Sequence, residues 1–307
     1  MSTSVANREM KALLDRLAPT EGLTLSPIEG VRLMRSSRMH PRAPILYEPC
    51  IVIVCQGRKI GYLGDRTHVY DPDHFLLLTL PMPLESETIA TPELPLLGVA
   101  IAIDLGVTAE LAHLLELPTP DTAVLADGIS SAPLDTALAD SVVRMLRALE
   151  NPGEARALGA GLLREITYRV LTGPRGDVLR AALARRGAFG QVATALRRIH
   201  ADYRDNLDVG TLASEAKLSP AAFHAQFKRI TSTSPMQYLK ATRLHKARLL
   251  MIHDGVSAAR AANRVGYESA SQFSREFKRM FGRTPVDEIK TIHAAYGIGK
   301  SESRDRP

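Results

Sequence analysis

The sequence lacks the features that mark several classes of protein. In its 307 residues no run approaches the roughly 18 consecutive apolar positions of a membrane-spanning helix. The opening segment MSTSVANREMKALLDRL is charged and unlike a secretory signal. Two cysteines, Cys50 and Cys55, cannot make a disulfide framework, which favours a reducing compartment. These absences predict a cytoplasmic protein with no membrane partner.

Motifs of common enzyme classes are also missing. The sequence has no glycine-rich phosphate loop and no Gly-x-Ser-x-Gly nucleophile elbow. We therefore expect no catalytic residue and no cofactor. With 45% apolar and 23% charged residues, the chain has the composition of a globular protein, and its length suits two domains of about 150 residues each.

Positive charge is concentrated at one end of the chain. Residues 1–190 hold 19 Lys+Arg and 22 Asp+Glu, a balance of −3, whereas residues 191–307 hold 20 and 11, a balance of +9. A basic segment attached to a mildly acidic one predicts a polyanionic partner, with nucleic acid favoured over a membrane surface. A surface tuned only for solubility is the alternative explanation of the charge.

Hydrophobic patterning predicts an α+β protein with several parts. Residues 1–18 have the spacing of an amphipathic helix, and short Val-, Ile-, Leu- and Tyr-rich runs between about 22 and 104 indicate roughly eight strands of a barrel or sandwich. Helical spacing follows Asp104, with two helices at about 134–149 and 154–171 that suit either a dimer face or packing on the barrel. The expected division is 1–21 arm, 22–185 effector-sensing barrel and helical hairpin, 186–192 linker, 193–291 DNA-binding domain and 292–307 flexible tail.

The basic segment contains an internal repeat. The sequence FHAQFKR at 223–229 is matched fifty residues later by FSREFKR at 273–279, and each copy is followed by a Thr- or Ser-Pro pair. In each copy a short helix and a turn precede a second helix with a Ser cap, and two phenylalanines at i and i+4 bury one face of that helix. This pattern is typical of a helix-turn-helix, whose second helix enters the major groove of DNA. A long basic helix at 235–250 is expected to join the two copies.

Residues 195–290 resemble the DNA-binding domain of the AraC/XylS family of bacterial transcription regulators, most closely in RLHKAR (243–248) and GYESASQFSREFKRMFGRTP (266–285). The first 190 residues are similar to the AraC-type N-terminal domain, and the whole chain is similar to YqhC-like regulators of this family. The motifs that carry this second likeness are YEP (47–49), KIGY (59–62), LLLTLPMPLESET (76–88) and LTGP (171–174). The resemblance implies a cupin-like barrel that senses an effector, and a double helix-turn-helix domain that binds promoter DNA and recruits RNA polymerase.

The resemblance also implies which side chains touch DNA. Outward residues of the two second helices are expected to contact bases: Ala221, His224, Ala225, Ser271, Ser274 and Arg275. Arg275 suits bidentate contact with guanine, and the two alanines offer only methyl contacts to thymine. Four further cations are expected to contact phosphates: Lys228, Arg243, Lys278 and Arg283. One departure from the family pattern is Lys217, because the family often has Gly in the first turn.

The effector site is expected in the barrel, and the residues proposed for it are Tyr47, Glu48, Cys50, Cys55 and Tyr62. Cys50 and Cys55 lie at i and i+5 of one strand and should point to opposite faces. Buried structural thiols and electrophile sensing are both open for them, and the resemblance includes regulators that respond to aldehydes. We expect a bacterial, cytoplasmic, small-molecule-responsive activator, presumed on the same grounds to be a homodimer.

Two other functional classes compete with this interpretation. The first is a cupin-type metalloenzyme with a basic C-terminal module, whose ligands by residue type would be His68, Asp71, Asp73, His74, Glu85 and Glu87. The spacing of these residues is poor for a metal site, and no His-x-His pair occurs among them. The second is a DNA-architectural protein without a ligand. We expect neither a metal nor an enzymatic activity.

Overall fold

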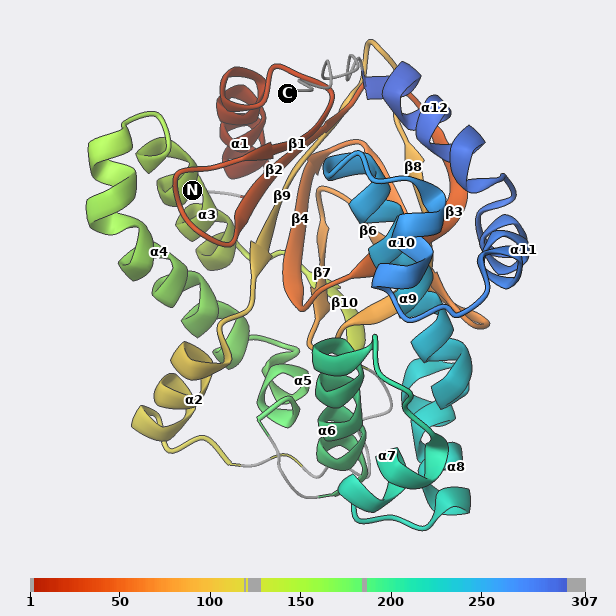
Figure 1. Ribbon diagram of the computed structural model, residues 1–307. Helices are drawn as coiled ribbons and strands as arrows, with labels where there is room; N and C mark the ends of the chain where they lie inside the picture. The colour runs from red at the N-terminus through yellow and green to blue at the C-terminus, as the bar shows by residue number, and fades with distance from the viewer. Residues whose placement is uncertain (1–2, 119, 121–127, 184–186, 297–307) are drawn as a thin grey trace. The chain divides into compact units, whose positions relative to one another are not determined.

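The structure is a computed structural model that describes residues 3–118, 120, 128–183 and 187–296 (Figure 1). The chain divides into two compact units, of which the first comprises Met1–Ala201 with Leu207–Tyr238 and the second Asp202–Asn206 with Leu239–Pro307. Among the described residues, no helix is both long and apolar enough to cross a membrane.

Two antiparallel sheets form the N-terminal part of the first unit. The six-stranded sheet runs in the order β1 (Gly22–Leu25), β2 (Val31–Ser36), β9 (Leu96–Ala102), β4 (Cys50–Gln56), β7 (His74–Leu78) and β10 (Ile129–Pro133). The four-stranded sheet runs in the order β3 (His40–Tyr47), β8 (Met82–Ile89), β5 (Arg58–Leu63) and β6 (Arg66–Tyr70). The predicted β-rich N-terminal domain is therefore present.

Burial along two strands explains their places in the sheets. Every residue of β4 is buried, as its unbroken apolar sequence CIVIVCQ requires of a strand covered on both faces. In β8, buried and half-buried residues alternate, so Met82, Leu84, Ser86 and Thr88 face inward. The four-stranded sheet thus has one inner face and one outer face.

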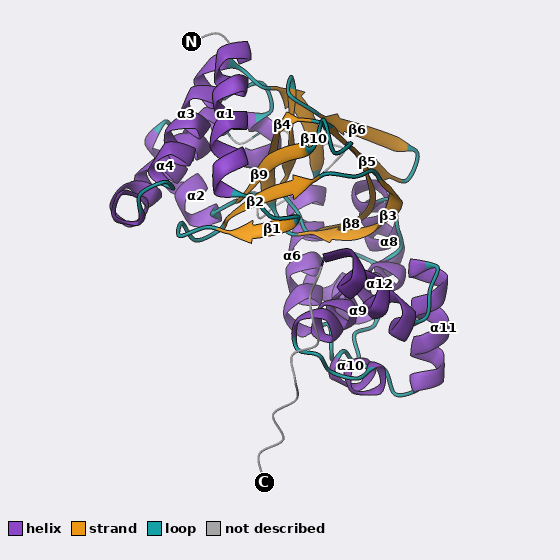
Figure 2. Ribbon diagram, turned by 90° about the horizontal axis from the view of Figure 1, so that it is seen from above, coloured by secondary structure: helices purple, strands orange, loops and turns teal. Residues whose placement is uncertain are grey.

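Helices cover one face of the six-stranded sheet (Figure 2). Helix α1 (Thr3–Leu17) lies on β4 and β9 and buries Met10, Leu13 and Leu14. Helix α3 (Thr136–Ala148) packs against both α1 and α4 (Pro152–Thr172). The first unit also contains α2 (Leu105–Leu114) and α5 (Gly176–Ala181), and Asp104 caps α2 through hydrogen bonds from Gly106 and Val107.

Three strands escaped the sequence analysis. Strand β2 interrupts its apolar residues with Arg32 and Arg35, and β8 alternates apolar with polar residues, so neither forms an apolar run. Strand β10 lies beyond Asp104, where only helices were expected, and its sequence ISSAP has little strand preference of its own. It is a strand because its backbone pairs antiparallel with β7, a partner distant in the sequence.

The expected linker and tail boundaries also differ from the structure. Helix α6 (Gly187–Asp202) occupies all but the first residue of the expected linker at 186–192. Burial of Phe189 and Val192 stabilises this helix despite the glycines that suggested a break. Helix α12 (Pro285–Tyr296) extends five residues past the expected domain end at 291, and residues 297–307 lie outside the described part.

The repeat folds as two short helix pairs. In the first unit α7 (Val209–Glu215) packs on α8 (Pro220–Thr231), and in the second α10 (Ala258–Arg264) packs on α11 (Ala270–Phe281). Helix α9 (Pro235–His253) begins in the first unit and continues into the second.

The turns within these two pairs differ in one residue. Lys217 has a φ of 58° and Gly266 a φ of 86°, both in the left-handed region that favours glycine. A Cβ at Gly266 would overlap the carbonyl oxygen of Arg204, which packs against this turn. The first turn therefore tolerates a side chain at the cost of backbone strain, whereas the second requires glycine.

We expect opposite effects from exchanging the residue types at these turns. Lys217→Gly should raise the free energy of unfolding by about 1 kcal/mol, because it relieves a left-handed non-glycine residue. Gly266→Ala should lower it by about 2 kcal/mol or more, because steric overlap adds to the backbone strain. Urea denaturation followed by circular dichroism measures both. A Gly266→Ala variant as stable as the parent would contradict this account of the second turn.

Candidate nucleic-acid interface and ligand site

Helix α8 is oriented by a cap and by two buried rings. Oγ of Ser219 accepts a hydrogen bond from the backbone N–H of Ala222 at 3.3 Å, and Pro220 occupies the first helical position. Phe223 and Phe227 are fully buried, with their ring centroids 5.5 Å apart. The opposite side of the helix is exposed, and its residues are Ala221, His224, Ala225 and Lys228.

Helix α11 has the same construction. Oγ of Ser269 accepts from the backbone N–H of Gln272 at 3.2 Å, and Phe273 and Phe277 are buried in the core of the second unit. Its exposed side carries Ser271, Ser274, Arg275 and Lys278. In the described part of the chain neither Arg275 nor Lys278 forms an ion pair, so both cations are available to an external anion.

The four residues expected at phosphates do not share one environment. Lys228, Lys278 and Arg283 are exposed. Arg243 is half-buried on α9, where its Nε donates to the carbonyl oxygen of Tyr203 at 2.6 Å and its Nη2 to that of Asp205 at 2.8 Å. The guanidinium of Arg243 therefore holds segment 202–206 against α9, and a phosphate contact would have to use its remaining N–H groups.

A polar network on α11 was not foreseen. The carboxylate of Glu276 accepts from the Tyr267 hydroxyl at 2.8 Å, from Nζ of Lys240 at 3.0 Å and from Nε2 of Gln272 at 3.2 Å. Burial would raise the pKa of Glu276, but these donors outweigh burial and hold it below its ordinary value. The network ties α11 to α9 and neutralises the acidic side chain of the helix.

The five residues proposed for the effector site do not share one face. Tyr47 faces inward, with its hydroxyl 3.0 Å from that of Tyr70, which in turn lies 3.4 Å from Oγ of Ser86. Cys50, at the start of β4, is close enough to Tyr70 to influence its ionisation. Tyr47 and Cys50 are therefore brought to the space between the two sheets.

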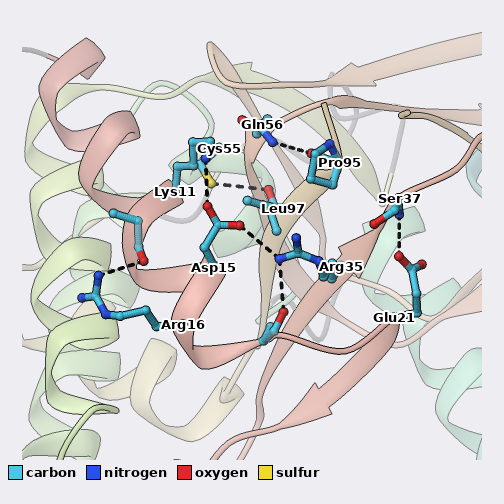
Figure 3. Close-up of polar contacts among 12 residues, drawn as sticks. Lys11, Asp15, Arg16, Glu21, Arg35, Ser37, Cys55, Gln56, Pro95 and Leu97 are labelled. Carbon is cyan, nitrogen blue, oxygen red and sulfur yellow. Dashed lines mark hydrogen bonds and ion pairs between the residues drawn. The ribbon is translucent and has the colours of Figure 1, made fainter. Parts of the chain in front are cut away.

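The other three proposed residues lie elsewhere. Tyr62 lies on the outer face of the four-stranded sheet and donates to Glu87 at 2.7 Å, and Glu48 is exposed. Cys55 faces α1, where Lys11 and Asp15 lie beside it (Figure 3). The two cysteines thus point to opposite faces of β4, as their spacing predicts.

Both thiols are poor nucleophiles in this environment. Burial raises the pKa of Cys50 and of Cys55 to about 12, so each thiol keeps its proton near neutral pH. Sγ of Cys55 donates to the carbonyl oxygen of Leu97 at 3.5 Å (Figure 3). The geometry therefore favours structural roles for the two cysteines over electrophile sensing.

The six residues considered as metal ligands do not form a site. Nowhere in the described ranges do three His, Cys, Asp or Glu side chains gather in a geometry that suits a metal ion. Asp71 lies 3.2 Å from Nδ1 of His74 in a tight turn, and Glu85 forms an ion pair with Arg42. Nothing in the geometry favours the metalloenzyme alternative.

Two family models match this chain. Residues 27–178 match the AraC-type transcriptional regulator N-terminus, and residues 212–290 match a helix-turn-helix domain. A putative AraC-like transcription regulator from Streptomyces lividans is 31% identical over 169 residues, which are 52% of this chain and 55% of that protein. The transcriptional activator RhaS of Escherichia coli is 34% identical over 85 residues, which are 28% of this chain and 31% of RhaS. The match thus spans about half of the first relative and a third of the second.

The fold has solved counterparts. The crystal structure of apo ToxT from Vibrio cholerae has a TM-score of 0.60 at 11% identity, covering 88% of this chain and 98% of ToxT. ToxT with a bound unsaturated fatty acid has a TM-score of 0.59 at 10% identity, covering 85% and 93%. At this identity the likeness establishes the fold, a β-rich N-terminal domain followed by a helical helix-turn-helix domain.

Replacing Glu276 should reveal the strength of its network. Because the folded-state pKa of Glu276 lies below its ordinary value, its ionised form stabilises the fold above that value, and the contribution is lost as the pH falls through the folded-state pKa. Glu276→Gln should lower the free energy of unfolding at pH 7 by about 1–3 kcal/mol. It should also flatten the fall in stability between about pH 6 and 3.

Denaturant titrations at several pH values measure both effects. Glu268→Gln is the matched control, because Glu268 is an exposed acid beside the cap of the same helix. Identical pH profiles for the parent and Glu276→Gln would rule out the proposed role of the network.

Proposed function

Because the chain belongs to the AraC/XylS family of transcriptional regulators, we propose that it binds promoter DNA sequence-specifically and that its β-rich domain responds to a small molecule. The observation that carries this proposal is the pair of capped helices α8 and α11. Each buries two phenylalanines and exposes an opposite face that ends in unpaired cations. The match of known regulators to this part of the chain supports the same conclusion.

We assign base contacts to the exposed faces of these two helices. In α8 the residues are Ala221, His224 and Ala225, and in α11 they are Ser271, Ser274 and Arg275. Short side chains near the helix start allow close approach to bases, and the unpaired guanidinium of Arg275 suits the two acceptors of guanine. Lys228, Lys278 and Arg283 would contact phosphates, with Arg243 in a mainly structural role.

The N-terminal domain is assigned the sensing role. In this proposal its two sheets are the walls of a cupin-like barrel, the effector binds between them near Tyr47, and α3 with α4 provides the face of a homodimer. Binding would shift the population of DNA-binding conformations, which requires different affinities of the effector for two states. A reactive carbonyl compound is one effector class that the resemblance suggests, but the burial of both thiols argues against its capture by cysteine.

The regulator would act in the bacterial cytoplasm, on nucleoid DNA, without enzymatic activity. We propose activation through contact with RNA polymerase, and the likeness to the activator RhaS supports this sign. The experiment is selection of genomic DNA fragments by the full chain, followed by footprinting and transcription in vitro. Protection of a promoter with increased transcription is expected, and failure to enrich any sequence over random DNA would overturn the proposal.

Two substitutions on one face of α11 should separate base reading from phosphate contact. Arg275→Ala should relax preference at one base position and cost about 1–3 kcal/mol on the selected site. Lys278→Ala should weaken all sequences alike and reduce the salt dependence of binding by about one phosphate contact. Sequencing of selected random DNA, with affinities measured at several salt concentrations, provides both readouts. An unchanged sequence profile for Arg275→Ala would refute its assignment.

A further inference from the structure

The inner face of the four-stranded sheet carries a row of polar side chains where a β-sandwich core is normally apolar. The strand register places Tyr70, Lys59, Thr88 and His40 side by side across β6, β5, β8 and β3. Tyr70 and Thr88 are buried, whereas Lys59 and His40 are half-buried. The bonding of each group therefore decides whether this row only supports the fold or can bind a ligand.

Lys59 has few partners for a lysine in such a place. Its ammonium has three N–H donors, and the hydrogen bond described for it goes to Oγ1 of Thr88 at 3.0 Å. Across the described residues no carboxylate forms an ion pair with Lys59. The acids of the neighbouring strand β8, Glu85 and Glu87, lie on the outer face of the sheet. An ammonium turned into a protein interior without a counter-ion is costly.

His40 supplies no counter-charge to Lys59. Its Nε2 lies 2.9 Å from Oγ of Ser36. Burial lowers the pKa of His40, and the charges of Lys59 and Arg38 lower it further against the opposite effect of Glu21. His40 is therefore neutral at pH 7, and the row of four side chains carries the single positive charge of Lys59.

The neighbouring row leaves room above the sheet. Gly61 lies opposite both His68 and Ser86, and Ala43 follows Ser86 on β3. A Cβ added to Gly61 would meet its nearest atoms only at 3.8 Å, so the position is not filled by a neighbouring group. Ala43 is exposed although it lies on the inner face, and Nε2 of His68 is buried without a hydrogen-bond partner. The row beside Lys59 is low, open at one edge, and supplies one unused nitrogen.

We propose that this inner face binds the carboxylate of a small organic monoanion, with Lys59 as its ion-pair partner and the Thr88 hydroxyl as a second donor. The inference rests on the effector role proposed for the domain and names the chemical class of the ligand. Thr88 accepts from Lys59 through Oγ1, so its own O–H stays available to donate. A single lysine beside a neutral histidine matches one negative charge, and a phosphate dianion would need further cations.

The rest of the ligand would lie over the low row. Gly61 and Ala43 give a flat surface for an apolar or ring-shaped body, while the linked hydroxyls of Ser86, Tyr70 and Tyr47 continue along the inner face. These hydroxyls would bind a polar substituent at the far end of the molecule. Burial lowers the pKa of Lys59 to about 8, and a bound carboxylate would raise it again by supplying the missing charge.

The experiment measures protection of Lys59 on the full chain without DNA. An acylating reagent labels neutral amines, and peptide mass spectrometry reports the labelling rate of each lysine. Benzoate and formate, as carboxylate probes, should slow labelling of Lys59 by about tenfold, since one unit of pKa lowers the neutral fraction by that factor. Benzamide and formamide, which have similar shapes and no charge, should have little effect. Lys11, which pairs with Asp15 on α1, is the internal control.

Three variants locate the site. Lys59→Met should abolish the rise in thermal midpoint caused by benzoate, and so should Gly61→Val, whose methyl groups would fill the low row. Glu85→Gln, on the outer face of the same sheet, should retain it. Circular dichroism checks that each variant folds, and labelling of the parent chain keeps the test independent of folding.

Equal labelling of Lys59 with the carboxylates and with their amides would overturn the proposal, as would a full benzoate response in Lys59→Met. Because no DNA is present, these outcomes are independent of the regulator assignment. Carboxylate protection without DNA binding would contradict the regulator assignment alone, and DNA binding without protection would contradict this site alone.

Discussion

The two helices assigned to DNA depend on one packing constraint, the burial of two phenylalanines four residues apart. Phe223 and Phe227 in α8, and Phe273 and Phe277 in α11, are all at or below 1% exposure. Because side chains at i and i+4 share one face of a helix, burying this pair sets the rotation of the helix about its axis. Every assignment of an outward residue follows from that rotation, and the serine caps set where each helix begins.

Around this common frame the two copies have diverged. The turn before α8 holds a lysine in a left-handed conformation, whereas the turn before α11 needs glycine because the backbone of Arg204 packs against it. Glu276 is bonded by three donors, but the residue at the corresponding place in α8 is Gln226. The second copy is thus more tightly built into its surroundings. This suits a helix whose Arg275 must be held in a fixed position to read a base.

The N-terminal domain works under a different constraint. Its strands bury enough apolar surface to fold, yet the inner face of the four-stranded sheet retains hydroxyl groups, an imidazole and one ammonium. Such groups weaken a core that exists only for stability, because each must be desolvated. Their persistence on one face, beside small residues, is the physical basis for assigning ligand binding to this sheet.

Local patterns in the sequence determined much of the DNA-binding part. The caps, the phenylalanine spacing and the repeat locate α8 and α11 and their outward residues, because helix faces follow from spacing alone. The charge division between residues 1–190 and 191–307 pointed to the same segment. Arg243 shows the limit of this reasoning, since its bonds to Tyr203 and Asp205 come from a segment about forty residues away.

Only the tertiary structure decided the character of the β-rich domain. Strand pairing joins distant residues, so the sequence did not reveal that β10 completes the sheet, that Tyr62 faces outward, or that Lys59 faces inward beside Thr88. Side-chain alternation assigns residues of one strand to two faces, but which face is covered depends on the packing of other strands and helices. For the same reason the raised pKa values of Cys50 and Cys55 follow from burial that no local motif encodes. The sequence by itself therefore determined which helices meet DNA, and the packing of the sheets decided which side chains are available to a ligand.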